Sequence, residues 1–148
     1  MGKNVIITGA TGMVGKGVML ECLDHEKIDR VLTIGRNKLD IEHPKLEEIL
    51  HGDFADFNPI KDKLSGYDAC FFCMGISSIG KKEDEYSRIT YHLTMGFAKT
   101  LLKYNPEMIF NYVSGAGTDS TEKGKSMWAL IKGKTENELL KLSFKDAY

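Results

Sequence analysis

The amino-terminal part of the chain combines an apolar segment, a glycine-rich turn and a helical pattern in direct succession. The apolar segment from Asn4 to Thr8 predicts a buried strand, and the helical pattern runs from Gly12 to Leu23. The turn from Gly9 to Gly15, which joins them, carries a glycine at every third position. A strand that enters a helix through such a turn brings backbone N–H groups and the positive end of the helix dipole to one point. This arrangement is typical of a site for a phosphate group.

Each glycine of the turn has its own expected role in a dinucleotide site. Gly9 permits the tight turn, Gly12 lets the backbone approach the pyrophosphate, and Gly15 allows the helix to pack closely on the strand. The residues between them that are expected to line the same site are Thr11, Met13 and Val14. In the alternative interpretation the glycines only tighten a turn. The position of the motif between a first strand and a helix favours the dinucleotide site.

Short apolar segments alternate with longer helical patterns along the rest of the chain. The expected strands are Asn4 to Thr8, Arg30 to Ile34, Glu47 to Leu50, Ala69 to Met74 and Met108 to Ser114. The expected helices are Gly12 to Leu23, Ile60 to Leu64, Glu83 to Lys103 and Thr121 to Leu142. Nearly continuous apolar strands separated by helices are typical of a parallel sheet that is covered on both faces. We therefore expect a doubly wound α/β fold of the Rossmann type, with three layers and a single domain over residues 1–148.

Size and charge agree with one such domain and exclude several classes of function. The chain has 148 residues, of which 42% are hydrophobic, and this is enough for one sizeable core. Its 20 basic and 21 acidic residues give a formal net charge of -1, which provides no surface for nucleic acid or an anionic membrane. No apolar segment is long enough to cross a bilayer, and no signal-peptide pattern precedes the first strand. We expect a cytoplasmic protein without nucleic acid or membrane partners.

The cysteines and histidines indicate neither a disulfide framework nor a metal site. Cys70 and Cys73 lie on one expected strand, where positions three apart point to opposite faces and are roughly 10 Å apart, too far for a disulfide. With Cys22 they make an odd total of 3 cysteines, and the 4 histidines lack a paired ligand spacing. We expect apolar packing for the cysteines and no metal.

The end of the second expected strand bears on the choice of dinucleotide. At this point an NAD site prefers an acidic residue, which accepts a hydrogen bond from the ribose. This chain has Arg36 and Lys38 there, and its first acidic residue is Asp40. A guanidinium pairs with the 2'-phosphate of NADP, so NADP is favoured, with NAD as the alternative. If Arg36 is only a solvated loop residue, no preference follows.

The expected helix from Glu83 to Lys103 is apolar on two sides. One stripe contains Tyr86, Ile89, Leu93, Phe97 and Leu101. The other contains Tyr91, Met95, Ala98 and Leu102. One side can cover the sheet, and the other needs the last helix, a missing part of the chain or a second subunit. Because exposed apolar faces mark interfaces and twofold dimers are common, we expect a homodimer through the long helices.

Motifs spread over nearly the whole chain resemble those of the short-chain dehydrogenase/reductase superfamily. They are TGATGMVG from Thr8 to Gly15, Gly35-Arg36, Asp53-Phe54, Ser114 and Lys132. More narrowly, the chain is similar to the atypical and extended branch of NAD(P)-binding, nucleoside-diphosphate-sugar epimerase-like proteins. The resemblance implies that Asp53 and Phe54 lie beside the adenine. It also implies that the cofactor runs along Cys73, Met74 and Gly75.

The same resemblance implies a catalytic role for Ser114, which would polarise a substrate carbonyl or hydroxyl, and for Lys132, which would hold the nicotinamide ribose. The family carries a tyrosine four residues before the lysine, where this chain has Trp128. Indole does not serve as a proton acid or base near neutral pH. Extended members also continue well beyond a sixth strand, whereas this chain stops at Tyr148, just after Ser143 to Ala147 begins what could be that strand. A truncated product or a fragment is expected.

Two functions stay open at this point, and the substrate is not indicated. The first is an NADP-dependent oxidoreductase or epimerase-like enzyme, and the second is a non-catalytic protein that senses NADP or regulates through it. A serine hydrolase that uses Ser114 does not fit, because the places of the elbow glycines are held by Tyr112 and Ala116. If the chain turns over at ordinary rates, another residue must supply the proton. The candidates are Tyr86, Tyr91 and Tyr112.

Overall fold

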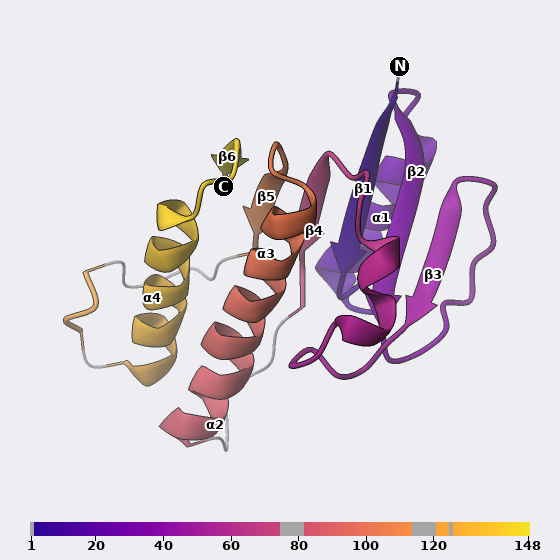
Figure 1. The fold of residues 1–148 in the computed structure, drawn as a ribbon. Coiled ribbons are helices and arrows are strands. Elements are labelled where there is room, and N and C mark those ends of the chain that lie inside the picture. Colours follow the sequence, from indigo (N-terminus) through magenta and orange to yellow (C-terminus); the bar gives the residue numbers. More distant parts are fainter. Residues whose placement is uncertain (1, 75–81, 114–120, 125) are drawn as a thin grey trace.

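The computed structural model, drawn in Figure 1, describes residues 2–74, 82–113, 121–124 and 126–148. Six parallel strands form one sheet in the order β3-β2-β1-β4-β5-β6. The strands are β1 Lys3–Thr8, β2 Ile28–Gly35, β3 Leu46–Leu50, β4 Ala69–Phe72, β5 Ile109–Tyr112 and β6 Asp146–Ala147. This order confirms the doubly wound fold, and it reverses between β1 and β4, where such folds place their ligand crevice.

Helices cover both faces of the sheet and complete the three layers. They are α1 Met13–Asp24, the 3-10 helix η1 Asn58–Lys63, α2 Glu83–Ser87, the π-helical turn η2 Arg88–His92, α3 Leu93–Tyr104 and α4 Met127–Lys141. In Figure 1, α1 lies behind the sheet, whereas η1, α3 and α4 lie in front of it. No helix within the described ranges has the length and apolar character needed to cross a bilayer.

Apolar side chains that point alternately to the two faces of the sheet form a hydrophobic core on each face. Val5 and Ile7 of β1 pack with Met19 of α1, whereas Ile6 packs on the other side in the cluster that contains Phe97 of α3. Phe97 is fully buried, and aromatic rings surround it at centroid distances between 4.9 and 5.9 Å. Burying one such ring stabilises the fold by about 1.5–3 kcal/mol.

Several element boundaries differ from those expected from the sequence. The segment around Ile60 is a 3-10 helix that starts one residue before Pro59, and the last helix begins at Met127 instead of Thr121. The late start agrees with Gly124 in the intervening segment, because glycine opposes helix formation. The helix expected from Glu83 to Lys103 contains the π-helical turn η2 and is therefore not a regular α-helix.

The second apolar side of this helical segment is covered by α4, one of the three partners left open by the sequence. α4 packs against α2, η2 and α3. Lys134 of α4 places its ammonium 4.3 Å from the centre of the Tyr91 ring. The apolar stripe that motivated a homodimer is thus accounted for within the chain, and the homodimer stays a prediction without this support.

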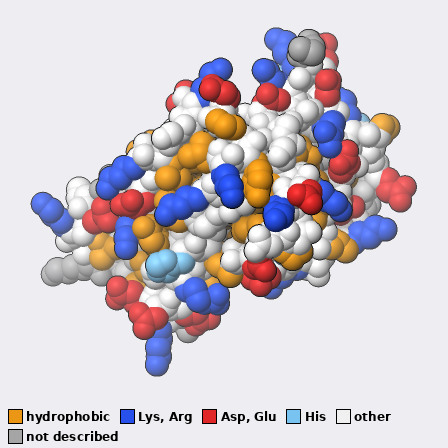
Figure 2. All heavy atoms as spheres, viewed as in Figure 1, with side chains coloured by type: hydrophobic (Ala, Val, Ile, Leu, Met, Phe, Trp, Pro, Cys, Tyr) orange, Lys and Arg blue, Asp and Glu red, His pale blue; other side chains and the backbone are white. Residues whose placement is uncertain are grey.

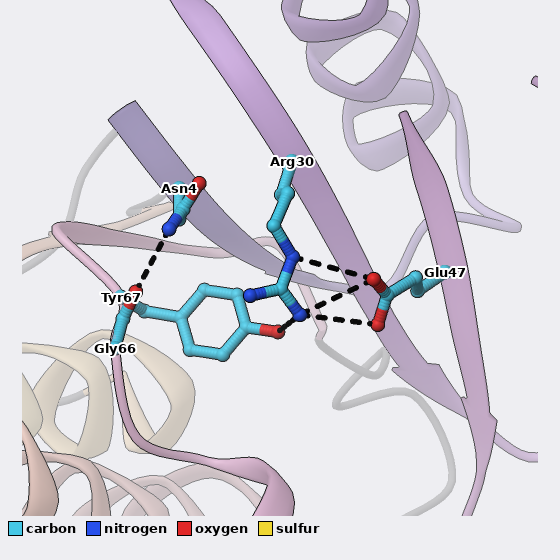
Figure 3. Close-up of polar contacts among 5 residues, drawn as sticks. All are labelled: Asn4, Arg30, Glu47, Gly66 and Tyr67. Carbon is cyan, nitrogen blue, oxygen red and sulfur yellow. Dashed lines mark hydrogen bonds and ion pairs between the residues drawn. The ribbon is translucent and has the colours of Figure 1, made fainter. Parts of the chain in front are cut away.

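The amino ends of the strands are joined by side chains that satisfy one another (Figure 3). The guanidinium of Arg30 donates to both carboxylate oxygens of Glu47, at 3.3 and 3.2 Å, and to the hydroxyl of Tyr67 at 3.3 Å. The side-chain amide of Asn4 donates to the Gly66 carbonyl at 3.1 Å. These contacts tie β1, β2, β3 and the segment before β4 together at one edge of the sheet.

Candidate functional site

The glycine-rich turn lies at the carboxyl end of β1, where the strand order reverses. Gly9 has φ +75, in the left-handed region that favours glycine, and a Cβ there would lie 2.6 Å from the carbonyl carbon of Cys73. A Cβ on Gly15 would collide with the carbonyl oxygen of Gly9. Both residues are therefore required by the chain's own packing, which agrees with the roles expected for them.

Gly12 differs from the other two glycines of the turn. Its φ of −82 and ψ of 168 are open to any residue, and a Cβ there would lie 3.4 Å from the Gly9 carbonyl oxygen, an ordinary contact. Its N–H donates to the Gly9 carbonyl at 3.0 Å. Neither the backbone nor the packing among the described residues requires glycine at this position. The missing side chain instead leaves space outside the turn, as a closely bound phosphate group would need.

The first turn of α1 is electrostatically suited to an anion. Among the described residues, no side chain caps this end of the helix, and its first turn carries no acidic residue. Met13 and Val14 point toward solvent, with 90% and 47% of their surface exposed. The unpaired N–H groups and the positive end of the helix dipole are thus available to a ligand.

A cleft of about 340 Å³ lies beside the turn. It is formed where β1, β2, β3 and β4 end and where η2 passes in front of the sheet. Residues predicted from the sequence that line it are Gly9, Thr11, Arg36, Phe54 and Met74. Charged lining residues that sequence reasoning missed are Glu48 and Arg88.

Arg36 follows β2 directly and extends across Gly52. A Cβ on Gly52 would lie 3.2 Å from Cγ of Arg36, so the glycine accommodates the arginine stem. The Arg36 side chain is exposed and forms no hydrogen bond or ion pair with any residue that the structure describes. Asp40, the first acidic residue after β2, does not line the cleft. The guanidinium is therefore free to pair with a ligand.

Glu48 is the acidic residue that lines the cleft, and it lies on β3 beside Thr33 of β2. Its carboxylate accepts the backbone N–H of Leu39 at 2.8 Å. The contact fixes the loop that follows Arg36. The sequence gives only a weak indication that Glu48 faces the cleft, because the pattern of an edge strand does not show which of its carboxylates points into a site.

The predicted cofactor residues that follow β3 and β4 differ in their position relative to the cleft. Phe54 is buried and lines the cleft, whereas the Asp53 carboxylate accepts the N–H of Ala55 at 3.0 Å and closes its own loop. Cys73 does not line the cleft, and burial raises the pKa of its thiol. Gly75 lies outside the described residues.

A second, much smaller hollow adjoins the cleft, since Met74 lines both. The Lys132 ammonium lies there, 3.5 Å from the Tyr112 hydroxyl, and donates to the carbonyl of Val113 at 3.3 Å. Burial lowers the pKa of Lys132 and raises the pKa of Tyr112. Ser114, the other predicted catalytic residue, lies outside the described residues.

Two tyrosines share this hollow with the lysine, namely Tyr86 and Tyr112. Trp128, which stands where the related enzymes carry tyrosine, is partly buried and lines neither the hollow nor the cleft. The described side chains that share the hollow with Lys132 thus include one phenol from β5 and one from α2. Within the described part of the chain, no three His, Cys, Asp or Glu residues gather as a metal site.

A shallow groove of about 540 Å³ continues from the cleft between η1 and α3. Phe54, Arg88 and Leu93 line both depressions. Figure 2 shows this face of the molecule, with basic side chains set among apolar ones over its middle. The groove adds Lys61 and Lys103 to the cationic groups near the cleft.

Two curated relatives match nearly all of the chain. Protein HTATIP2 of Rattus norvegicus is 27% identical over 144 residues, which are 96% of this chain and 58% of the relative. Protein FMP52-2, mitochondrial, of Scheffersomyces stipitis is 25% identical over 147 residues, which are 97% of this chain and 62% of the relative. The chain thus spans less than two thirds of the length of these relatives.

Solved structures share the fold of this chain. The Bordetella bronchiseptica enzyme WbmG in complex with NAD superposes with a TM-score of 0.78 at 12% identity, covering 99% of this chain and 52% of the enzyme. A short chain dehydrogenase family protein from Francisella tularensis gives 0.72 at 18% identity, covering 93% and 61%. These likenesses concern the fold alone. Residues 5–127 match the NAD dependent epimerase/dehydratase family, and the chain therefore belongs to that family.

Proposed function

We propose that this chain binds a nicotinamide dinucleotide, NADP in preference to NAD, in the cleft at the carboxyl ends of β1, β2 and β4. The observation that carries the proposal is Gly12, whose missing side chain leaves room at a helix end that is suited to an anion. The WbmG structure was solved with NAD, and the family is described as NAD dependent, which supports the same ligand class.

The residues around the cleft suggest how each part of the dinucleotide is held. The N–H groups of Thr11, Met13, Val14 and Gly15 would bind the pyrophosphate, and Arg36 would pair with the 2'-phosphate. Phe54 and Met74 provide apolar walls. Lys132 would hold the nicotinamide ribose, because its ammonium lies in the hollow that adjoins the cleft. When bound, the dinucleotide supplies or accepts a hydride.

We further propose an oxidoreductase or epimerase-like reaction in which Tyr112 handles the proton. Of the three tyrosines considered, Tyr91 lies under Lys134, whereas Tyr86 and Tyr112 lie beside Lys132. The hydroxyl of Tyr112 is the one within hydrogen-bond reach of that ammonium. Burial raises the pKa of Tyr112, so its phenol stays protonated near neutral pH. It would therefore be in the form that can donate a proton, as the reduction of a carbonyl requires.

A non-catalytic NADP sensor is the second candidate. It is favoured by Trp128, which replaces the family's proton donor and lines neither hollow. Oxidation of NADPH with small carbonyl compounds distinguishes the two. An enzyme that uses Tyr112 loses turnover on Tyr112→Phe with little loss of NADPH binding, whereas a sensor binds NADPH without turnover.

Calorimetric titration with NADPH and NADH tests the choice of cofactor. We expect NADPH to bind at least tenfold more tightly, since a charge-assisted pair contributes about 1.5–3 kcal/mol. Arg36→Ala should remove most of that difference without changing the melting temperature. Equal or tighter binding of NADH by the unmodified chain would contradict the NADP preference.

A further inference from the structure

Arg88 lines the same cleft as Arg36, although it comes from a different layer of the molecule. Arg36 follows β2 at the edge of the sheet, whereas Arg88 begins η2 in the helical layer in front of the sheet. The π-helical turn is wider than an α-helical turn. In it Thr90 is buried, while Arg88 is exposed and Ile89 lines the cleft.

The charges that line the cleft are not balanced among the residues that the structure describes. The ionised side chains of these lining residues are two guanidiniums and the carboxylate of Glu48. That carboxylate already accepts the N–H of Leu39. Neither arginine side chain forms a hydrogen bond or ion pair with any described residue. Two like charges that face one small cleft repel each other, and a dianionic group between them removes this cost.

We infer that Arg88 is a second specificity residue, which pairs with the 2'-phosphate of NADP together with Arg36. This inference rests on the proposed dinucleotide site and names its second phosphate ligand. Arginine suits the role because its planar fork of N–H donors matches phosphate oxygens. Arg36 and Arg88 would hold the adenosine end of the ligand from two different elements.

Another role for Arg88 predicts a different outcome. A guanidinium can also stack on the adenine ring, which would stabilise every adenine nucleotide to a similar degree. A phosphate ligand instead discriminates between nucleotides that differ only in the 2'-phosphate. The pair 2',5'-ADP and 5'-AMP isolates this difference, because neither contains the nicotinamide half.

The test is a calorimetric titration of the full chain and its variants with 2',5'-ADP and 5'-AMP. We expect Arg88→Ala to weaken 2',5'-ADP binding about tenfold and 5'-AMP binding less than twofold. Arg88→Lys keeps the charge but loses the planar fork of donors, so its affinity for 2',5'-ADP should lie between those of the unmodified chain and Arg88→Ala. Lys103→Ala is the matched control, since Lys103 lines the adjoining groove but not the cleft. Lys103→Ala should change the affinity for either nucleotide less than twofold.

The outcomes separate the inference from the proposed function. If the unmodified chain prefers 2',5'-ADP and Arg88→Ala keeps that preference, the role of Arg88 is wrong and the NADP site stands. An equal loss for both nucleotides means adenine stacking and also overturns the inference. If the unmodified chain binds neither these nucleotides nor NADPH, the proposed function fails, and the inference fails with it. Melting temperatures of all variants should agree, because the substituted side chains are exposed.

Discussion

The two ends of the sheet use their polar side chains in opposite ways. At the amino ends, Arg30 is bound by Glu47 and Tyr67, and the buried amide of Asn105 bonds to three backbone groups. At the carboxyl ends, Arg36 and Arg88 have no such partner among the described residues. Polar groups satisfied within the chain stabilise the fold, whereas polar groups without partners around a cleft are available for a ligand. Substitutions at the two ends should therefore separate stability from binding.

The largest expected effects are at the glycine turn, because it contains both a glycine that the packing requires and a glycine that leaves space for a ligand. Gly15→Ala places a Cβ against the carbonyl of Gly9, so the turn or the helix must shift. We expect a loss of at least about 3 kcal/mol in the free energy of unfolding. Urea unfolding followed by circular dichroism measures this loss. A fully stable Gly15→Ala chain would contradict the packing described for the turn.

Gly12→Ala is the matched variant, with the same added methyl group on the outside of the turn. Its Cβ meets only an ordinary contact, so unfolding should change by less than about 1 kcal/mol. Binding of NADPH should be lost, because the methyl group occupies the space proposed for the pyrophosphate. Unimpaired NADPH binding would show that the glycine is not there for a ligand.

Asn105→Ala tests the amino end of the sheet. The Asn105 side chain accepts the N–H of Tyr67 at 2.9 Å and donates to the carbonyls of Leu64 and Leu101 at 2.7 and 3.1 Å. Its removal leaves buried backbone groups without partners, at a cost of about 2–3 kcal/mol. Asn37→Ala, at an exposed position of the cleft, is the control and should unfold like the unmodified chain. Equal free energies of unfolding for Asn105→Ala and Asn37→Ala would contradict the stabilising role given to Asn105.

Local patterns were sufficient to predict most of the fold. The strand around Ile6 and the turn after it were predicted because apolar runs and glycine spacing are properties of short segments. The late start of α4 was not predicted, although Gly124 gives a local reason for it. The π-helical turn was not predicted either, since η2 packs against α4, which is distant in the sequence. The place of Asp53 beside the adenine stays a prediction from the family resemblance. Its carboxylate accepts the N–H two residues later, which is a common local turn.

The lining of the cleft was predicted where one segment supplies it and missed where several segments converge. Arg36 was predicted to face a ligand because the position after the second strand has a known meaning in dinucleotide folds, and it does line the cleft. Glu48 and Arg88 could not be found, since only the folded chain shows which side chains of an edge strand and a distant helix reach the same cleft.

A smaller effect is expected at Lys132. Lys132→Ala should weaken NADPH binding about tenfold, because the ribose would lose a charged donor, whereas Ser114→Ala should leave binding nearly unchanged. Fluorescence titration with NADPH measures both. Lys141→Ala, at an exposed position of the same helix, is the control. Binding that is equally strong in Lys132→Ala would separate the second hollow from the dinucleotide site.

The smallest effect is expected for Arg30→Ala. The Arg30 and Glu47 side chains are 46% and 57% exposed, so water screens the pair, and its loss should cost only about 0.5 kcal/mol. Thermal unfolding at low salt resolves this difference. NADPH affinity should not change, because these residues lie at the other end of the sheet from the cleft. A loss of NADPH binding would break the separation between the two ends.

The division between the two ends is tested most directly by the shift in melting temperature that saturating NADPH causes. A ligand at about one hundred times its dissociation constant stabilises the folded state by about 2.7 kcal/mol, which corresponds to roughly 5–10 °C for a chain of this size. The unmodified chain and Arg30→Ala should show the same shift, and Gly12→Ala should show none. No shift in the unmodified chain, or an equal shift in Gly12→Ala, would contradict the assignment of the carboxyl end to a dinucleotide.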